Sequence, residues 1–227
     1  MMPIPLLALD ALDVLGVLAS PDRCAACDAR VSFRTVFCRA CACTVLEDSA
    51  ASVSSSFTYA PFRYGGAIAE ALRRFKYEGR ADLARPLAHL LLRALPALRP
   101  LQIDAVVPVP LHRARLVTRG FNQAALLARP LARHLSAAFL PCALERVVET
   151  EVQASLRKDP RARNVRGAFV PRGSRGGHGP HTSRALEGAR VLLVDDVTTT
   201  GATLAAATFA AREAGAYSVH AVVLARA

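Results

Sequence analysis

The chain lacks any stretch of about 18 consecutive uncharged apolar residues, the length that a membrane-spanning helix needs. We therefore expect no stable insertion into a membrane. The apolar residues 1–20 also lack the basic start of a secretory signal, and they carry Asp10 and Asp13 among their leucines. We expect this segment to form an amphipathic helix that docks on the body of a cytoplasmic protein.

Two common nucleotide-binding signatures are missing as well. The sequence has no G-x-x-x-x-G-K-[ST] and no G-x-G-x-x-G that opens a helix, which disfavours NTPase and dinucleotide-binding functions. Acidic residues are scarce, because 18 Asp and Glu stand against 29 Lys and Arg, for a net charge of +11. Such a charge favours a polyanionic partner. An arginine-rich source genome is the alternative explanation.

The most informative segment is 191–203, VLLVDDVTTTGAT. Its first four residues are apolar and predict a strand buried on both faces of a parallel sheet. Asp195 and Asp196 follow where that strand would end, and an Ala-rich helix is expected over 204–214. A Thr/Gly loop that enters a helix offers backbone N–H groups to a phosphate, and two carboxylates can accept hydrogen bonds from a vicinal diol. The pattern predicts a site for a sugar 5′-phosphate; the alternative is an acidic strand end before a capped helix.

Cysteines are confined to a short region, since five of the six lie between Cys24 and Cys43. Two C-x2-C pairs separated by ten residues are typical of a tetrahedral metal site. Such a closed site is structural and supplies much of the folding free energy of a small ribbon. Zinc is the expected metal, while an iron–sulfur cluster or disulfides are the alternatives, and Cys43 could replace Cys41. The predicted ligands are Cys24, Cys27, Cys38 and Cys41.

Basic segments follow the ribbon. A strand is expected over 103–110, and residues 111–133 then hold five arginines and no carboxylate; Pro130 should kink or break the helix in this region. Fork-shaped guanidinium groups at the end of a central strand suit a second anionic group such as pyrophosphate. Residues 157–166 are basic too, and we expect a mobile loop that closes over the ligand, or an exposed loop without a ligand role.

The segment 191–203 resembles the 13-residue phosphoribosyl-pyrophosphate (PRPP) motif of type I phosphoribosyltransferases. The cysteine ribbon, Phe75–Tyr77, Val107–His112, Arg119–Gln123, Gln153, Arg163–Phe169 and this motif occur in an order that resembles the ComF family. The resemblance implies an α/β fold, Rossmann-like, with a mostly parallel sheet flanked by helices and a small N-terminal zinc ribbon. We expect a docking helix over 1–20, the ribbon over 21–55, and the phosphoribosyltransferase-like domain over 56–227 with a disordered insertion at 171–188.

The resemblance also implies roles for individual residues. Asp195 and Asp196 would contact the ribose hydroxyls. The PRPP phosphate loop would comprise Thr198, Thr199, Thr200, Gly201, Ala202 and Thr203. Pyrophosphate would be bound by His112, Arg113, Arg115, Arg119 and Lys76. Catalysis would involve the acid pair and the loop residues Arg157, Lys158, Arg161 and Arg163. Mg²⁺ would accompany PRPP.

Two functions are compatible with these features. In the first, the protein binds PRPP and supports DNA uptake in natural transformation, with pentosyl transfer to an unknown acceptor; its partners would include single-stranded DNA and DNA-uptake or recombination proteins. Residues 73–77, RRFKY, interleave aromatic and basic side chains as a stacking platform for single strands would. In the second, the protein is an active nucleobase or other phosphoribosyltransferase of nucleotide salvage without a DNA role.

Overall fold

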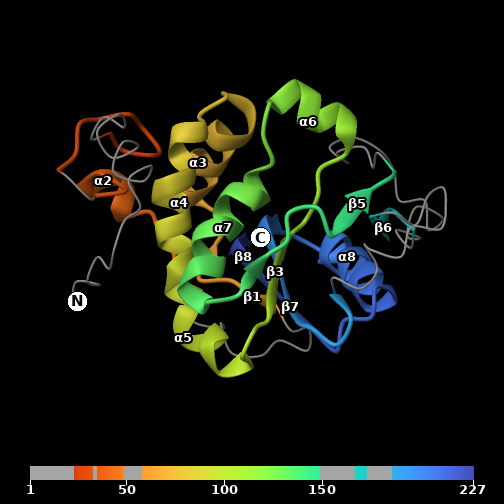
Figure 1. Cartoon of the computed structure of the whole chain (residues 1–227). Coiled ribbons are helices and arrows are strands. Elements are labelled where there is room, and N and C mark those ends of the chain that lie inside the picture. The colour runs from red at the N-terminus through yellow and green to blue at the C-terminus, as the bar shows by residue number, and fades with distance from the viewer. Residues whose placement is uncertain (1–22, 33–34, 49–57, 149–166, 173–185) are drawn as a thin grey trace.

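A computed structural model describes residues 23–32, 35–48, 58–148, 167–172 and 186–227 of the chain (Figure 1). The expected helix over 1–20, the loop residues 153–166 and most of the insertion at 171–188 lie outside the described residues. Among the described residues, no helix is long and apolar enough to cross a membrane.

A six-stranded parallel sheet organises the fold, with the order β1-β8-β7-β3-β4 and β2 paired to β8. The mostly parallel sheet expected from the sequence is therefore confirmed. The strands are β1 (Thr58–Tyr59), β2 (Phe62–Arg63), β3 (Ala105–Pro108), β4 (Ala138–Phe139), β7 (Arg190–Thr198) and β8 (Ser218–Arg226). A separate antiparallel pair consists of β5 (Leu144–Arg146) and β6 (Phe169–Pro171).

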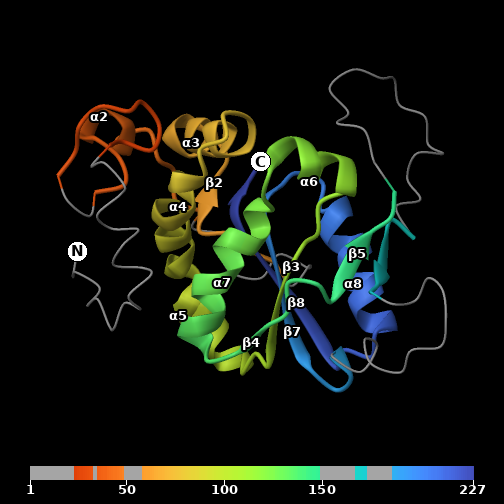
Figure 2. The ribbon, with the colours of Figure 1, turned by 45° about the horizontal axis from the view of Figure 1, so that its top comes forward.

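Helices cover both faces of the sheet, as Figure 2 shows. One face carries α3 (Gly66–Tyr77), α4 (Ala84–Leu91), α5 (Leu95–Leu98) and α7 (Gln123–Leu135), and the other carries α8 (Ala202–Glu213). Short 3₁₀ turns, η1 (Ala81–Leu83), η2 (Leu92–Ala94) and η3 (Arg99–Leu101), connect the helices of the first face. Successive side chains of a strand point to opposite faces, so Leu192 packs with the first set of helices and Leu193 with α8.

The central strand is longer than its apolar run. We expected a strand that ends at Val194, but β7 continues through both acids to Thr198. The reason is its unequal neighbours: β3 pairs with β7 only as far as Pro108↔Val194, whereas β8 pairs with it as far as Thr198↔Arg226. The second half of β7 thus has a strand on one side only.

Helix α7 continues through Pro130, so the break that we expected there as one of two alternatives, the other being a kink, does not occur. Proline removes one backbone hydrogen bond and costs about 3 kcal/mol in a helix interior. Four buried apolar side chains on both sides of Pro130 offset this cost, because each buried Leu contributes about 2 kcal/mol. These side chains are Leu127, Ala128, Leu131 and Ala132.

The cysteine-containing segment packs directly on the body. It consists of a turn over 24–29, closed by an antiparallel bridge between Arg23 and Arg30, and the one-turn helix α2 (Arg39–Ala42). Cys24 and Phe37 are buried in the same apolar cluster as Leu72 and Phe75 of α3. The ribbon and the larger domain therefore share one core, and Figure 2 shows α2 beside α3.

Candidate sugar-phosphate site and metal centre

The paired acids lie at the topological switch point of the sheet. From β3 the chain passes through α7 to β4 on one side, and from β7 it passes through α8 to β8 on the other side. Because such crossovers are right-handed, α7 and α8 cover opposite faces. Open α/β sheets bind their ligands outside the carboxyl ends of the strands at such a point, which here is the end of β3 and β7.

The Thr/Gly segment provides an anion-binding turn at this edge. Thr198 is the last residue of β7, Thr199 and Thr200 are exposed, and α8 begins at Ala202. Gly201 has a φ of 77°, a left-handed conformation that favours glycine. Gly201 has no side chain that could cap α8, but Oγ1 of Thr200 accepts the N–H of Ala202 at 3.4 Å. The first N–H groups of a helix have no partner within the helix and can bind an anion.

Lys76 contacts the acid pair from the last turn of α3. Its Nζ lies 2.8 Å from Asp196 Oδ1, and the two side chains are only 17% and 8% exposed. The backbone N–H of Asp196 donates to Asp195 Oδ1 at 2.9 Å. We expected Lys76 to bind pyrophosphate; in the structure it forms an ion pair with Asp196, one of the two acids predicted to contact ribose. Whether it also contacts pyrophosphate stays a prediction.

Burial and mutual repulsion act on the charges of this cluster. Burial and the neighbouring Asp196 carboxylate together raise the pKa of Asp195 to about 7. Burial alone would lower the pKa of Lys76, but the Asp196 carboxylate outweighs it and holds that pKa above its usual value. Arg146, at the end of β5, partly counteracts the rise for Asp195. Sequence reasoning missed Arg146, because nothing in its local pattern connects it with the acids.

The replacement Asp195→Asn should change how stability depends on pH. The pKa of Asp195 is about 7 in the folded chain and about 3.9 in unfolded chains. Between these values the folded state binds more protons, so this carboxyl lowers the stability of the wild type as pH rises, by up to about 1.4 kcal/mol per unit. Asparagine cannot ionise. Urea denaturation between about pH 5 and 8 should show the variant gaining stability relative to the wild type until about pH 7. A constant difference across this range would contradict the raised pKa.

The arginine-rich segment after β3 is a short helix, α6 (Arg113–Arg119). His112 caps it by accepting the N–H of Ala114 through Nδ1 at 3.4 Å, and no residue of the helix is buried. The guanidinium of Arg119 lies 5.3 Å from the centre of the Tyr77 ring, which brings α6 next to the end of α3. Figure 2 shows α6 at the end of the molecule where β8 and the chain terminate.

The predicted catalytic loop lies outside the described residues, but its two ends are held together. Arg146 of β5 pairs with Phe169 of β6 in antiparallel register, and its guanidinium lies 5.4 Å from the Phe169 ring centre. The charge of Arg146 also lowers the pKa of Asp195, after the larger effect of Lys76. The roles of Arg157, Lys158, Arg161 and Arg163 stay predictions.

The expected stacking platform over 73–77 does not form. Phe75 is fully buried and packs against Phe121, with ring centres 5.4 Å apart. Arg73 forms ion pairs with Glu70 and Glu78, and Arg74 is only 7% exposed. The prediction failed because the segment is helical, so that its aromatic and basic residues point in different directions. Tyr77, 66% exposed, is the aromatic side chain of the segment that remains on the surface.

The four predicted metal ligands lie together. Their sulfur atoms are all within 4.8 Å of one another, and Cys27 Sγ and Cys38 Sγ are 3.7 Å apart. Thiolates on a tetrahedral zinc with Zn–S bonds of about 2.3 Å would be separated by about 3.8 Å, so the cluster fits such a metal. Cys43 is exposed and is not part of the cluster.

Backbone groups around Cys24 favour its thiolate form. Burial would raise the pKa of this thiol, but hydrogen bonds from the backbone at Cys38, Cys27 and Ala26 outweigh it and lower the pKa to about 6. Metal ligation requires the thiolate. Burial and the neighbouring cysteines instead raise the pKa of Cys41, so the assignment of the cluster as a metal centre rests on the positions of the four sulfur atoms.

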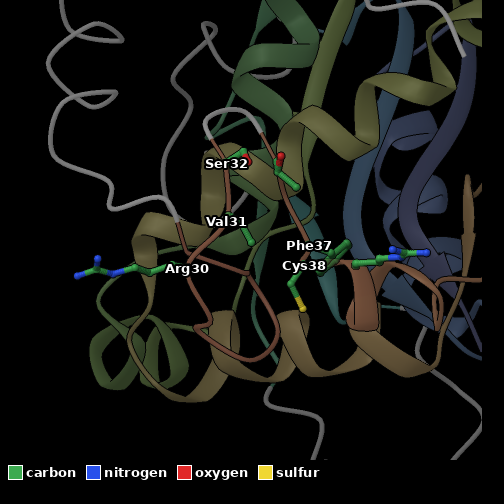
Figure 3. A pocket seen from close by; sticks show the side chains of 7 residues that line it. Arg30, Val31, Ser32, Phe37 and Cys38 are labelled. Atoms are coloured by element: carbon green, nitrogen blue, oxygen red, sulfur yellow. The ribbon is translucent and has the colours of Figure 1, made fainter.

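A hollow on the ribbon surface adjoins the candidate metal centre, because the predicted ligand Cys38 is among its lining residues (Figure 3). It has a volume of about 390 Å³, and its lining residues are Arg30, Val31, Ser32, Thr35, Phe37, Cys38 and Arg39. Two of these residues are arginines, and Arg30 extends away from the other labelled side chains, Val31, Ser32, Phe37 and Cys38. The hollow is open to solvent, and it contains none of the residues that the sequence singled out for sugar-phosphate binding.

Comparison with known proteins agrees with the geometry. Residues 122–227, which include β7 and its loop, match the family model of the phosphoribosyl transferase domain. Competence protein F of Haemophilus influenzae is 36% identical over 69% of this chain and 66% of its own length. DNA utilization protein YhgH of Escherichia coli is 34% identical over 63% and 60%. Competence protein ComFC of Bacillus subtilis is 29% identical over 63% and 52%.

The chain therefore spans between 52% and 66% of the length of these relatives. The aligned relatives share competence or DNA-utilization names, and the matched domain contains the strand, the acid pair and the loop described above. With its type I phosphoribosyltransferase fold and its four-cysteine ribbon, the chain belongs to the ComF family.

Proposed function

We propose that this protein binds PRPP together with Mg²⁺ at the carboxyl end of β7 and supports the handling of DNA during its uptake. The observation that supports PRPP most strongly is the acid pair, Asp195 and Asp196, beside the start of helix α8 at the topological switch point. A sugar with a 5′-phosphate needs both features, because its diol donates to carboxylates and its phosphate accepts from backbone N–H groups.

Different residues at this edge of the sheet would bind the 5′-phosphate, the ribose and the pyrophosphate of PRPP. The 5′-phosphate would lie on the backbone over 198–203, and the ribose hydroxyls would donate to Asp195 and Asp196. Pyrophosphate would lie toward α6, where His112, Arg113, Arg115 and Arg119 are located. Carboxylate and phosphate oxygens are the ligands that Mg²⁺ prefers, and when bound it would neutralise charge on the diphosphate.

Pentosyl transfer is the reaction that such a site could perform. The bond between ribose C1 and the pyrophosphate oxygen would break, a bond from C1 to an acceptor nucleophile would form, and pyrophosphate would leave with the bonding electron pair. Cations of α6 and of the 157–166 loop would stabilise the leaving group, and closure of that loop would exclude water. The acceptor is unknown, and salvage of a nucleobase without a DNA role is the competing function.

Calorimetric titration of the metal-replete protein with PRPP and Mg²⁺ tests the central proposal. We expect saturable binding of one PRPP per chain, followed in an acceptor screen by release of pyrophosphate with the correct acceptor. Folded protein that gives no binding would overturn the proposal. Tight binding without pyrophosphate release from any nucleobase would count against salvage and leave a ligand-binding role in DNA uptake.

The DNA role rests on charge and on the names of the relatives. The chain carries a net charge of +11, and α6 carries the exposed Arg113 and the half-buried Arg115 and Arg119 with no acidic residue in the helix. The relatives are named for competence and for DNA utilization. We propose single-stranded DNA and proteins of DNA uptake or recombination as partners. A cytoplasmic location fits this proposal, because cysteine thiols stay reduced there.

Retention of single-stranded DNA should depend steeply on salt. If the protein contacts Z phosphates, a plot of the logarithm of its affinity for single-stranded DNA against the logarithm of the salt concentration has a slope of about −0.7Z. Replacing Arg113 and Arg115 by glutamine should reduce that slope by about 1.4, measured by filter retention between about 50 and 200 mM salt. The matched control replaces Arg99 and Arg212, two exposed arginines at the opposite end of the sheet. Equal losses in both variants would mean non-specific attraction, and no retention at low salt would end the DNA proposal.

The metal of the ribbon is proposed to be zinc. A cluster of four cysteines leaves no open coordination position, so the metal would be structural. Elemental analysis of the purified protein should give one zinc per chain. Iron together with visible absorption would instead identify an iron–sulfur cluster with the same four ligands.

A further inference from the structure

Helix α3 is held at its beginning by the ribbon. Its N-cap residue, Gly65, has no side chain that could satisfy the first N–H groups. The hydroxyl of Thr44 fills this role from the ribbon: it accepts the N–H of Ala67 at 2.9 Å and donates to the carbonyl of the predicted ligand Cys41 at 2.8 Å. A capping hydroxyl is worth about 1 kcal/mol to a helix.

At the start of α3 the backbone of Thr44 lies so close to position 66 that only glycine fits there. Gly66 has a φ of +48°, and a Cβ atom there would lie 2.3 Å from the carbonyl oxygen of Thr44. The start of α3 is therefore fitted closely to the segment that follows the second cysteine pair.

The ribbon also holds α3 at its other end. Asp28, directly after the ligand Cys27, forms ion pairs with Arg74 of the last turns of α3 and with Arg80 beyond it. Arg74 is buried and also donates to the carbonyl of Ala25 at 3.2 Å. The backbone N–H of Asp28 donates to the carbonyl of Cys24 at 3.0 Å. The turn that presents the first two thiols thus also positions the Asp28 carboxylate.

Between these two attachments, α3 presents Lys76 to the acid pair. Lys76 follows Arg74 by two residues, and its Nζ lies 2.8 Å from Asp196 Oδ1. Its charge matters for an anionic ligand: without a cation at this place, two adjacent carboxylates would repel the phosphates of PRPP, and the repulsion is strong because the pair is largely shielded from water. A fixed Lys76 should therefore favour PRPP binding.

We propose that the ribbon is a metal-dependent clamp on α3, with Asp28 and Thr44 as positioning residues, so that metal binding by the four cysteines and PRPP binding at the acid pair strengthen each other. The proposal rests on the proposed binding of PRPP. Coupling between two sites is reciprocal at equilibrium: if the metal tightens PRPP binding by some factor, PRPP tightens metal binding by the same factor.

The first test uses the unaltered protein. Zinc affinity is measured by equilibrium competition with a chromogenic zinc chelator at constant Mg²⁺, with and without saturating PRPP. We expect PRPP to tighten zinc binding at least about fivefold, the lower range of measured couplings. Since PRPP itself binds zinc weakly, the same competition is run on the variant with Asp195→Asn and Asp196→Asn, in which PRPP should have no tightening effect.

The second test uses variants that keep all four thiols. Asp28→Asn removes the carboxylate charge, and asparagine tolerates the left-handed conformation of this residue, whose φ is 60°. Thr44→Val removes the capping hydroxyl at nearly the same shape. In each variant with a full zinc content, calorimetry should show PRPP binding weakened at least about fivefold.

Two matched controls separate positioning from a general loss of stability. Thr44→Ser keeps the hydroxyl and should bind PRPP as the wild type does. Glu47→Gln removes the ion pair between Glu47 of the ribbon and Arg93 of the body. This ion pair does not involve α3. The Glu47→Gln variant should leave PRPP affinity unchanged.

The outcomes distinguish this proposal from the one on which it rests. If the wild type binds no PRPP, the proposed function itself fails. If the wild type binds PRPP but its zinc affinity is the same with and without PRPP, the clamp is overturned and the proposed function stands. Wild-type affinity for PRPP in zinc-loaded Asp28→Asn would also overturn it. If a variant fails to fold, the zinc competition experiment on the wild type still tests whether metal binding and PRPP binding are coupled.

Discussion

Replacing both Asp195 and Asp196 by asparagine should abolish PRPP binding, raising the Kd at least about a hundredfold. Each carboxylate would lose a charge-assisted hydrogen bond to a ribose hydroxyl, worth about 1.5–3 kcal/mol, and the two losses add to at least about 3 kcal/mol. The variant also leaves Lys76 without its partner carboxylate. Calorimetric titration with PRPP and Mg²⁺ measures the effect directly.

The control for this experiment is Asp104→Asn. Asp104 immediately precedes β3 and forms an ion pair with Arg190 at the start of β7, at the opposite end of the same two strands. The Asp104→Asn variant loses one carboxylate from the same pair of strands but leaves the carboxyl ends of β3 and β7 unaltered. Its affinity for PRPP should therefore stay at the wild-type value. Binding that survives in the double variant would show that the acid pair is not the ribose site.

Removing two of the four clustered thiols, by Cys24→Ser with Cys27→Ser, should abolish metal binding and unfold the ribbon. Structural zinc sites contribute on the order of 10 kcal/mol to folding, and the ribbon has little core of its own. Because Cys24 and Phe37 share the apolar cluster of α3, the damage should extend to the body. If about 3 kcal/mol of the loss reaches the body, its Tm should fall by about 10 °C.

Two exposed cysteines provide the control for the ribbon experiment. Cys43 and Cys142 lie outside the four-thiol cluster, so replacing both by serine should change neither the metal content nor the Tm. Metal analysis, thermal denaturation and hydrogen exchange over residues 23–48 measure both variants. A Cys24/Cys27 variant that retains its metal and its folding would mean that these thiols are not ligands.

Local order along the chain could be predicted because it depends on neighbouring residues. The apolar run before Asp195 predicts a buried strand, and the Thr/Gly turn before an Ala-rich stretch predicts a helix start; both are present in β7 and α8. The C-x2-C spacing likewise brings each pair of thiols together within one turn. Such features need only short-range backbone geometry, which the residue types themselves determine.

Predictions from short sequence patterns failed where the burial of side chains determined the structure. The interleaved residues of 73–77 looked like an exposed platform, yet Phe75 is in the core and Arg74 is nearly buried. Pro130 suggested an interrupted helix, yet packing on the sheet keeps α7 continuous. In both cases the decisive energy comes from contacts with segments distant in sequence, which no short pattern contains.

The sequence by itself determined the strand, the acid pair, the Thr/Gly loop and the two C-x2-C pairs, since contiguous residues with strong local preferences specify each of them. Only the tertiary structure decided that Lys76 neutralises Asp196, that β3 ends beside the acids, and that Asp28 holds Arg74, 46 residues away. The physical reason is that ion pairs between distant residues form only after strand order and helix packing have brought them within a few ångströms, at an entropic cost that the shared core offsets.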